Sequence, residues 1–285
     1  MAIFYAFCCI FCSAMNDFVF KLFARKPRSR GLFVFVIGIA WAITSLFLPG
    51  LKGASWQTTI IWGVISGFFS VVGNLLLIEA MGKQSAGLCS TIYRLNLALV
   101  VPGAWILFKE TNTLLQALGI ALAFAAVLFF LPGSKSSEKN PDAKLGLILV
   151  IIAAVLRAGM GLSYKYGFNL GASANGVNLI NSLCWIIGGM IYFLLRERQN
   201  NTPGYTDRKI AGYGVVSGLF VFGIVFFMAH SVRLGNASIV LPIMQMSFIL
   251  TFALSTIFLK EKITVYKILA LASGAAALLL LSIKP

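Results

Sequence analysis

The stretch WGVISGFF, residues 62–69, returns as YGVVSGLF at residues 213–220, a spacing of 151 residues (213 − 62). The same spacing superposes the Lys-Glu pair at 109–110 on the pair at 260–261, and the alignment between these landmarks has no gap. The chain is therefore a tandem repeat of itself. Membrane proteins built from two copies typically hold their ligand between the copies.

Composition places the chain in a membrane. Hydrophobic residues make up 59% of its 285 residues, charged residues 11%, and the mean hydropathy is +0.92. Runs of about 17 to 26 apolar residues can cross about 30 Å of hydrocarbon. We identify ten such runs, at residues 3–23, 32–48, 60–78, 86–108, 114–131, 145–170, 177–195, 210–229, 237–259 and 266–283. They are continuously apolar, which indicates transmembrane helices and not barrel strands.

A polar segment divides the chain. PGSKSSEKNPDAK, residues 132–144, has the composition of a linker. It separates a first five-helix repeat, residues 1–131, from a second, residues 145–285. Because five is odd, the second repeat is expected to enter the bilayer inverted relative to the first. We therefore predict an all-α membrane protein of two inverted repeats around a central cavity.

Loop charges agree with inversion, since Lys and Arg favour the cytoplasmic side. One face of the predicted topology holds Arg25, Lys26, Arg28, Arg30, Lys83, Lys135, Lys139, Lys144, Arg196, Arg198, Arg208, Lys209, Lys260 and Lys262. The other holds Lys52, Lys109, Arg233 and Lys284. This bias predicts a multi-pass protein of the plasma membrane with both termini extracytoplasmic. It also explains the net charge of +15 without a nucleic-acid partner.

The helical segments SAGLCSTIYRLNLALVVPGAWILFKE (residues 85–110) and NASIVLPIMQMSFILTFALSTIFLKE (residues 236–261), together with the two inverted repeats, resemble the drug/metabolite transporter superfamily in its ten-helix EamA-like branch. The resemblance implies a basket of helices whose cavity opens alternately to each face, lined mainly by the runs at 3–23, 60–78, 86–108, 145–170, 210–229 and 237–259. Members are often drawn with cytoplasmic termini, whereas the charges here favour the reverse.

Charged groups deep in a bilayer are costly, so they normally face a cavity or a partner. Arg157, at the centre of its run, is the strongest candidate: its guanidinium can bind a carboxylate or phosphate, or pair permanently with a buried acid. Asp17 is the acid well inside a run. It can bind an ammonium group, carry a coupling proton, or neutralise Arg157 or its i+4 neighbour Lys21.

Further candidates follow from the repeat. Arg94 and Gln245 are partners (245 − 94 = 151) and are expected at one central site, with Tyr93 and Asn96 beside Arg94. The remaining candidate substrate-binding residues are Tyr164, Lys165, Asn178 and Asn181. Interhelical hydrogen bonding is the commoner use of Asn in membranes.

Enzyme motifs are missing from the sequence. It contains no P-loop, dinucleotide fingerprint, nucleophile elbow or HExxH motif. The five cysteines lie in apolar runs without metal-ligand spacing. We therefore expect a protein that is not an enzyme and uses no cofactor or metal.

The primary hypothesis is a secondary transporter of a small anionic or zwitterionic metabolite, amino-acid-like, working by alternating access between the repeats. The alternatives are proton-coupled efflux of cationic or lipophilic compounds through Asp17, a nucleotide-sugar or sugar-phosphate carrier, and a non-transporting scaffold or lipid-headgroup translocase. Its partners would be a small-molecule substrate, the lipid bilayer and, for efflux, a coupling proton. A single repeat interface allows a monomer to work alone.

Overall fold

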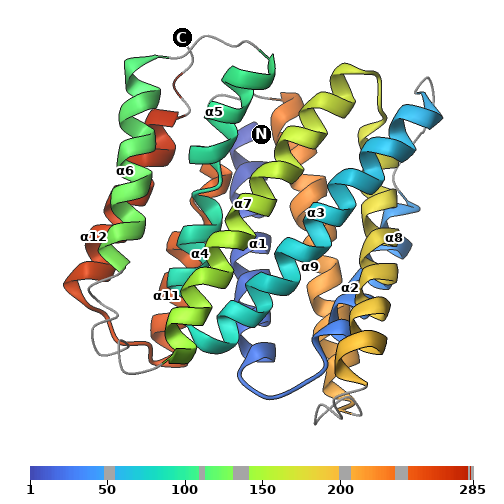
Figure 1. Cartoon of the computed structure of the whole chain (residues 1–285), viewed down its shortest axis with the longest axis horizontal. Helices are drawn as coiled ribbons and strands as arrows, with labels where there is room; N and C mark the ends of the chain where they lie inside the picture. The colour runs from blue at the N-terminus through green and yellow to red at the C-terminus, as the bar shows by residue number, and fades with distance from the viewer. Residues whose placement is uncertain are drawn as a thin grey trace.

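The computed structural model describes residues 1–47, 55–108, 113–130, 141–198, 207–234, 243–281 and 283. Within these ranges the regular structure is entirely helical, and the helices pack side by side in one bundle (Figure 1). They are α1 Ala2–Ala24, α2 Arg30–Ser45, α3 Trp56–Lys83, α4 Ala86–Arg94, α5 Leu97–Phe108, α6 Leu114–Phe130, α7 Pro141–Asn169, α8 Ala174–Tyr192, the π-helical turn η2 Phe193–Glu197, α9 Lys209–Leu234, α11 Ser247–Leu259 and α12 Val265–Leu281.

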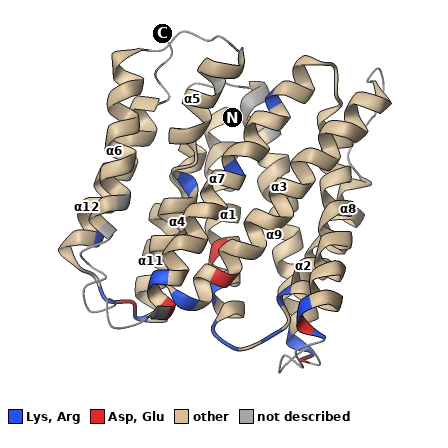
Figure 2. Cartoon of the chain, viewed as in Figure 1, with Lys and Arg blue, Asp and Glu red and all other residues tan. Residues whose placement is uncertain are grey.

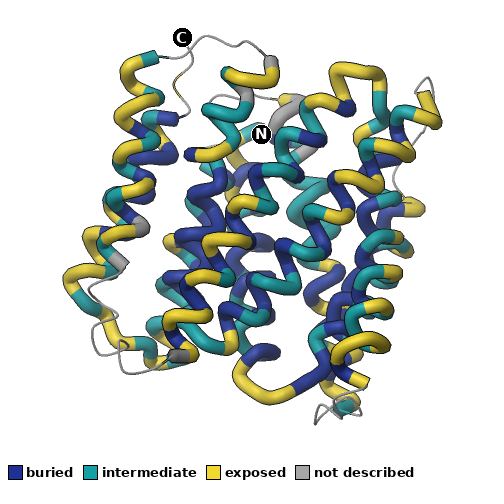
Figure 3. The backbone as a smooth tube through the Cα atoms, viewed as in Figure 1, coloured by how far each residue is buried: buried dark blue, intermediate teal, exposed yellow. Residues whose placement is uncertain are grey.

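The surface of the bundle is that of a membrane protein. Among the described residues, six helices are long and apolar enough to cross a bilayer, and four shorter apolar helices of 10–17 residues accompany them. Large apolar side chains are exposed along their outer faces, while the buried residues gather in the middle of the bundle (Figure 3). A soluble monomer rarely exposes so much contiguous apolar surface. The chain is thus a multi-pass helical membrane protein.

Among the described residues the predicted runs overlap helices, with three main differences, and residues 237–242 of the run at 237–259 lie outside the described residues. The run at 86–108 is divided into α4 and α5, and the run at 177–195 ends in the π-helical turn η2. The third difference is that α7 begins at Pro141, inside the segment predicted as a linker. The preceding part of that linker, 132–140, lies outside the described residues.

Serine side chains start several helices. Ser29, Ser55, Ser85 and Ser173 stand before α2, α3, α4 and α8, and each side-chain oxygen accepts a hydrogen bond from the backbone amide three residues later. Such caps satisfy one of the amide groups that a helix leaves free at its N-terminus. Each of these helices is therefore fixed at its start by its own sequence.

The helix packing is reciprocal between the halves of the chain. α3 packs on α7 and α8, while α9, which holds the matching GxxxG motif, packs on α1 and α2. Three further pairs join one helix of each half: α2 with α8, α4 with α11, and α6 with α12. In Figure 1 the pair α6 and α12 lies at one edge of the bundle and α2 and α8 lie at the other.

Glycines make the closest crossings possible. A Cβ atom at Gly63 or Gly67 would lie 2.9 Å or less from side chains of α8, and one at Gly214 or Gly218 would lie 2.6 Å or less from side chains of α2. Where lipid is as apolar as the side chains, close van der Waals packing of this kind holds helices together. Both GxxxG motifs therefore serve packing.

The helix predicted over 86–108 is interrupted at its middle. Leu95, after α4, has φ −73° and ψ 4°, and Met246, 151 residues later (246 − 95), has φ −73° and ψ 6° before α11. The matching short-range hydrogen bonds are Leu95 N to Ile92 O and Ala98 N to Leu95 O, and Met246 N to Ile243 O and Ile249 N to Met246 O. Tightened turns of 3₁₀ type thus stand at equivalent points of the two halves.

Candidate functional site

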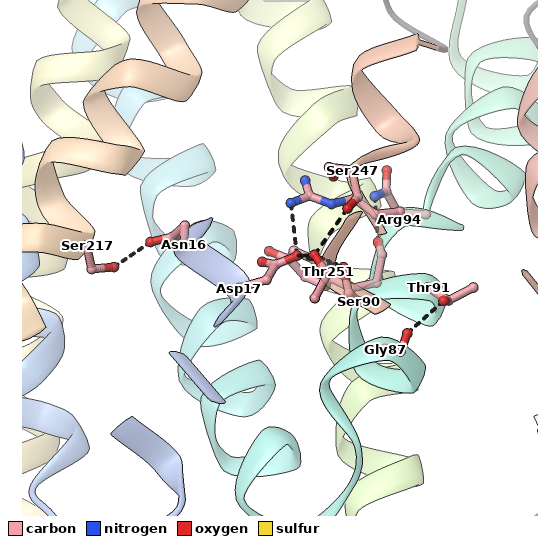
Figure 4. Close-up of polar contacts among 11 residues, drawn as sticks. Asn16, Asp17, Gly87, Ser90, Thr91, Arg94, Ser217, Ser247 and Thr251 are labelled. Carbon is pink, nitrogen blue, oxygen red and sulfur yellow. Dashed lines mark hydrogen bonds and ion pairs between the residues drawn. The ribbon is translucent and has the colours of Figure 1, made fainter. Parts of the chain in front are cut away.

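Asp17 is the centre of a buried polar cluster at the middle of the bundle. Its carboxylate, on α1, is 2% exposed. Its Oδ2 atom accepts hydrogen bonds from Ser90 Oγ at 2.6 Å and Thr251 Oγ1 at 3.4 Å, and lies 3.4 Å from Arg94 Nη2 (Figure 4). Ser90 and Arg94 lie on α4 and Thr251 on α11. One carboxylate therefore joins α1 to the reciprocal pair α4 and α11.

Arg94 is only partly satisfied by Asp17. It is 7% exposed, and its Nε atom has no hydrogen-bond partner among the described residues. Ser247, fully buried at the start of α11, likewise has no partner for its Oγ atom within the described part of the chain. Figure 4 shows both side chains beside Asp17 and Thr251. Because buried polar groups are normally paired, Arg94 and Ser247 keep a hydrogen-bonding capacity that the described residues do not use.

Arg157, on α7, carries the second guanidinium of the site. Its Cζ atom lies 5.7 Å from the ring centroid of Tyr93, and Cζ of Arg94 lies 5.9 Å from the same ring. Nη1 of Arg157 also contacts Met160 Sδ at 3.3 Å. Among the described ion pairs none involves Arg157. The permanent pair with a buried acid, one of two roles open from sequence, is therefore not formed with any described residue.

The charges of this cluster do not cancel. It contains the guanidinium groups of Arg94 and Arg157 and the single carboxylate of Asp17. Asp17 lies seven residues from the end of α1 (24 − 17), or about 10 Å at 1.5 Å per residue. A charge at the centre of a bilayer costs about 2.5–3.5 kcal/mol or more unless it is paired or hydrated. Among the described residues no carboxylate pairs with Arg157, so its guanidinium carries the excess charge of the cluster.

The interruption after Arg94 shapes the site. Asn96, 5% exposed, donates from Nδ2 to the backbone oxygen of Tyr93 at 2.7 Å, which satisfies a carbonyl group at the break. Gln245, the repeat partner of Arg94, is half-buried one residue before the second break at Met246. Irregular backbone inside a membrane is tolerated where protein or a water-filled cavity surrounds it.

Of the other predicted site residues, Asn178, Asn181 and Tyr164 form contacts between helices. Asn181, fully buried on α8, donates to Tyr164 Oη of α7 and accepts from Ser66 Oγ of α3 at 3.0 Å. Asn178 contacts Ser45 Oγ of α2 at 3.5 Å. Both amides thus bridge helices, which is the commoner role of Asn in membranes. Lys165 follows Tyr164 on α7 and is half-buried.

The ion pair between Asp17 and Lys21, expected from their i+4 spacing, does not form. Lys21 donates to the backbone oxygens of Met81 at 2.7 Å and Gln84 at 2.5 Å, and not to Asp17. These carbonyl groups belong to the C-terminal end of α3, where a helix leaves acceptors without partners. Asp17 turns to Arg94 instead, because tertiary packing places α4 beside it.

The serine and threonine of the cluster, Ser90 and Thr251, were not among the predicted site residues. A signal for them exists in the sequence. Ser90 stands four residues before Arg94, and Ser247 stands four residues before Thr251, so each pair shares one helix face. Polar pairs at this spacing in apolar runs could have identified the faces of α4 and α11 that meet Asp17.

Glu261 anchors the cluster from the end of α11. Its Oε1 atom accepts from the backbone amide of Ala86, at the N-terminus of α4, at 3.0 Å. A carboxylate is favourable there because the helix dipole is positive at that end. Glu110, its repeat partner, lies outside the described residues.

Metal-binding geometry is not found in the described ranges. No three His, Cys, Asp or Glu side chains come together there as a metal ion would require. The chemistry that the cluster offers is therefore that of guanidinium groups, hydroxyl groups and one carboxylate.

The fold and the cluster define a class: a polytopic helical membrane protein whose central cluster holds two guanidinium groups and one carboxylate. The sequence profile of the EamA-like transporter family matches residues 1–131 and 144–283. The chain belongs to the EamA-like transporter family. This family is part of the drug/metabolite transporter superfamily, as the sequence resemblance predicted.

Individual relatives are more distant. The uncharacterized protein MJ1333.1 of Methanocaldococcus jannaschii is 33% identical over 98 residues, which are 34% of this chain and 71% of that protein. Its length is therefore about 138 residues (98 / 0.71), roughly half of this chain. A solved crystal structure superposes with a TM-score of 0.64 at 17% identity, over 98% of this chain and 96% of the other. This likeness concerns the fold alone.

Proposed function

We propose that the protein is a secondary transporter that moves a small anionic or zwitterionic metabolite by alternating access through a central site. The site is formed by α1, α4, α7 and α11, and the moving units are two inverted five-helix repeats. The reciprocal helix pairs, the matched breaks at Leu95 and Met246, and a relative of about half the length support the two-repeat mechanism.

The observation that carries the substrate class is the charge excess of the cluster. The cluster holds two guanidinium groups and one carboxylate, and Asp17 is already engaged by Arg94, Ser90 and Thr251. A substrate carboxylate or phosphate would supply the missing negative charge at Arg157. Arg94 Nε and Ser247 Oγ, which have no hydrogen-bond partner among the described residues, would bind further oxygen atoms of the same anion. In an amino-acid-like substrate, the ammonium group would compete with Arg94 for Asp17.

The charges of the central cluster also distinguish among the alternative substrates. Sugar phosphates and nucleotide sugars share the anionic chemistry that Arg157 favours. Cationic compounds would have to displace Arg94 from Asp17, which is the reason that we place proton-coupled efflux second. For any of these, the protein would act in the plasma membrane, as a monomer, without a cofactor.

Binding measurements test this proposal. The purified protein is titrated with L-alanine, succinate, glucose 6-phosphate and tetraethylammonium, and the unfolding temperature is recorded. A ligand that binds only the folded state raises that temperature by mass action. We expect an anionic or zwitterionic compound to stabilise the wild-type protein and the same compound to drive counterflow in proteoliposomes.

Two variants that each remove one positive charge distinguish an effect at the central cluster from a general effect of charge at the surface. Arg157→Gln should abolish the stabilisation and the counterflow, because the free guanidinium is removed. Arg198→Gln, at an exposed position after η2, should retain both. Stabilisation by tetraethylammonium alone, lost in Asp17→Asn, would overturn the anion proposal in favour of efflux.

A further inference from the structure

A second basic region lies far from the central cluster, at the end of the bundle where α1 and α3 terminate and α7 begins. Here the structure has a hollow of about 350 Å³. Its lining residues are Ala24, Arg25, Lys26, Pro27, Arg30, Gly82, Lys83 and Asp142, and we call it the basic pocket. Its volume falls in the range of about 300–1,000 Å³ typical of small-molecule sites.

Only part of the positive charge of the basic pocket is neutralised within the protein. Arg30 pairs with Glu79, and Lys83 Nζ lies 2.7 Å from Asp142 Oδ1. Arg25 and Lys26, both exposed, form no ion pair within the described part of the chain. The two acids therefore balance two of the four cations.

Helix dipoles do not remove the remaining charge. The C-terminal ends of α1 and α3 each contribute about half a negative elementary charge, and the N-terminal end of α7 contributes about half a positive one. This sum is smaller than the two charges of Arg25 and Lys26. The basic pocket therefore keeps a positive potential, and it does so in a concave site where several donors converge.

The form of the basic pocket suits a phosphate group. Two guanidinium and two ammonium groups from the α1–α2 connection and from α3 border one hollow, and a phosphate group offers several acceptor oxygens to such a set. Gly82 lets the end of α1 approach, since a Cβ there would lie 3.2 Å from Ala24 O and 3.7 Å from Arg30 Nη2. Figure 2 shows that Lys and Arg residues gather at this end of the bundle.

We propose that the basic pocket binds a phosphate-bearing anion at the membrane boundary. Its position at the ends of apolar helices is the level of lipid headgroups, where basic pockets between helices bind anionic lipids. The phosphate can come from an anionic phospholipid or from a soluble compound. This binding is separate from transport at the central cluster.

The test uses the purified full chain in a neutral detergent, with phosphatidylglycerol, phosphatidylcholine and glycerol 3-phosphate as probes. Native mass spectrometry counts bound lipid, and the unfolding temperature reports stabilisation. We expect phosphatidylglycerol to bind and phosphatidylcholine not to bind. Displacement of phosphatidylglycerol by glycerol 3-phosphate would assign the pocket to a soluble phosphate, and its failure to compete would assign it to lipid.

Matched double variants locate the binding. Arg25→Gln with Lys26→Gln should weaken binding of the phosphate probe about 30-fold, corresponding to about 1 kcal/mol for each basic residue. Arg208→Gln with Lys209→Gln removes the same charge at exposed positions before and at the start of α9, and should leave binding within about twofold of wild type. Equal losses in both variants, or equal binding of both lipids, would overturn the proposal.

Discussion

At the scale of the residue, the pair formed by Asp17 and Arg94 dominates the energetics of the central cluster. Both side chains are buried, and breaking a buried pair leaves an uncompensated charge that costs about 3–5 kcal/mol. Asp17→Asn is therefore expected to lower the unfolding temperature of the purified protein strongly. Adding Arg94→Gln should recover much of the loss, because the orphaned guanidinium is then also gone.

Thermal unfolding of the two single variants and the double variant measures this coupling. A double variant as unstable as the sum of the single changes would show that the two charges act independently. Binding of the anionic probe provides a separate readout: it should be weaker in Arg94→Gln, since the free Nε donor is removed.

The sequence predicted which charged residues meet in the central cluster better than it predicted their partners. Asp17, Arg94 and Arg157 stand out in apolar runs because a charge there is costly. The choice of Arg94 over Lys21 as the partner of Asp17 depends on how α4 and α3 are placed around α1, which spacing along one helix does not reveal. Hydroxyl groups such as Ser90 are common in membrane helices, so their role became visible only from the packing.

At the scale of the element, the close crossing of α2 and α8 allows the helix packing to be tested. A Cβ atom at Gly189 would lie 2.5 Å from Phe35 N and 2.7 Å from Gly31 O, both backbone atoms that cannot move without the helix. Gly189→Ala should therefore destabilise the protein by about 1–3 kcal/mol, the usual range for overpacking. Gly212→Ala, where no atom lies within 4 Å, should be neutral or slightly stabilising.

Unfolding temperature and detergent-solubilised yield of the two variants check this prediction. Equal behaviour of Gly189→Ala and Gly212→Ala would mean that α2 and α8 do not cross at these glycines. The two variants are well matched, because both replace glycine by alanine and differ only in the space around the residue.

The apolar runs predicted the positions of the helices, but they did not predict the helix breaks. Nothing between Arg94 and Asn96 is a glycine or proline, and Pro102, which lies inside α5, is not where the helix is interrupted. The break instead accompanies tertiary contacts: Arg94 reaches Asp17, and Asn96 satisfies the freed carbonyl of Tyr93. Such interruptions are set by neighbouring helices and not by local propensity.

At the scale of the whole molecule, the proposed inversion of the repeats would place corresponding loops on opposite sides of the membrane. The α1–α2 connection holds Lys26, and the α7–α8 connection holds Leu170. The positive-inside rule puts the first in the cytoplasm and, with inversion, the second outside. Phe47, after α2, should also lie outside. All three side chains are exposed, so a cysteine at any of them should be accessible.

Labelling of intact cells with a membrane-impermeant maleimide tests this arrangement, with the parent chain as the blank for its five buried or half-buried cysteines. Phe47→Cys and Leu170→Cys should react at once, and Lys26→Cys only after the cells are permeabilised. The reverse pattern at all three sites would keep the inversion but reverse the orientation, placing both termini in the cytoplasm. Reaction of Lys26→Cys and Leu170→Cys from the same side would contradict inversion itself, and with it the rocking of two opposed repeats around Arg157.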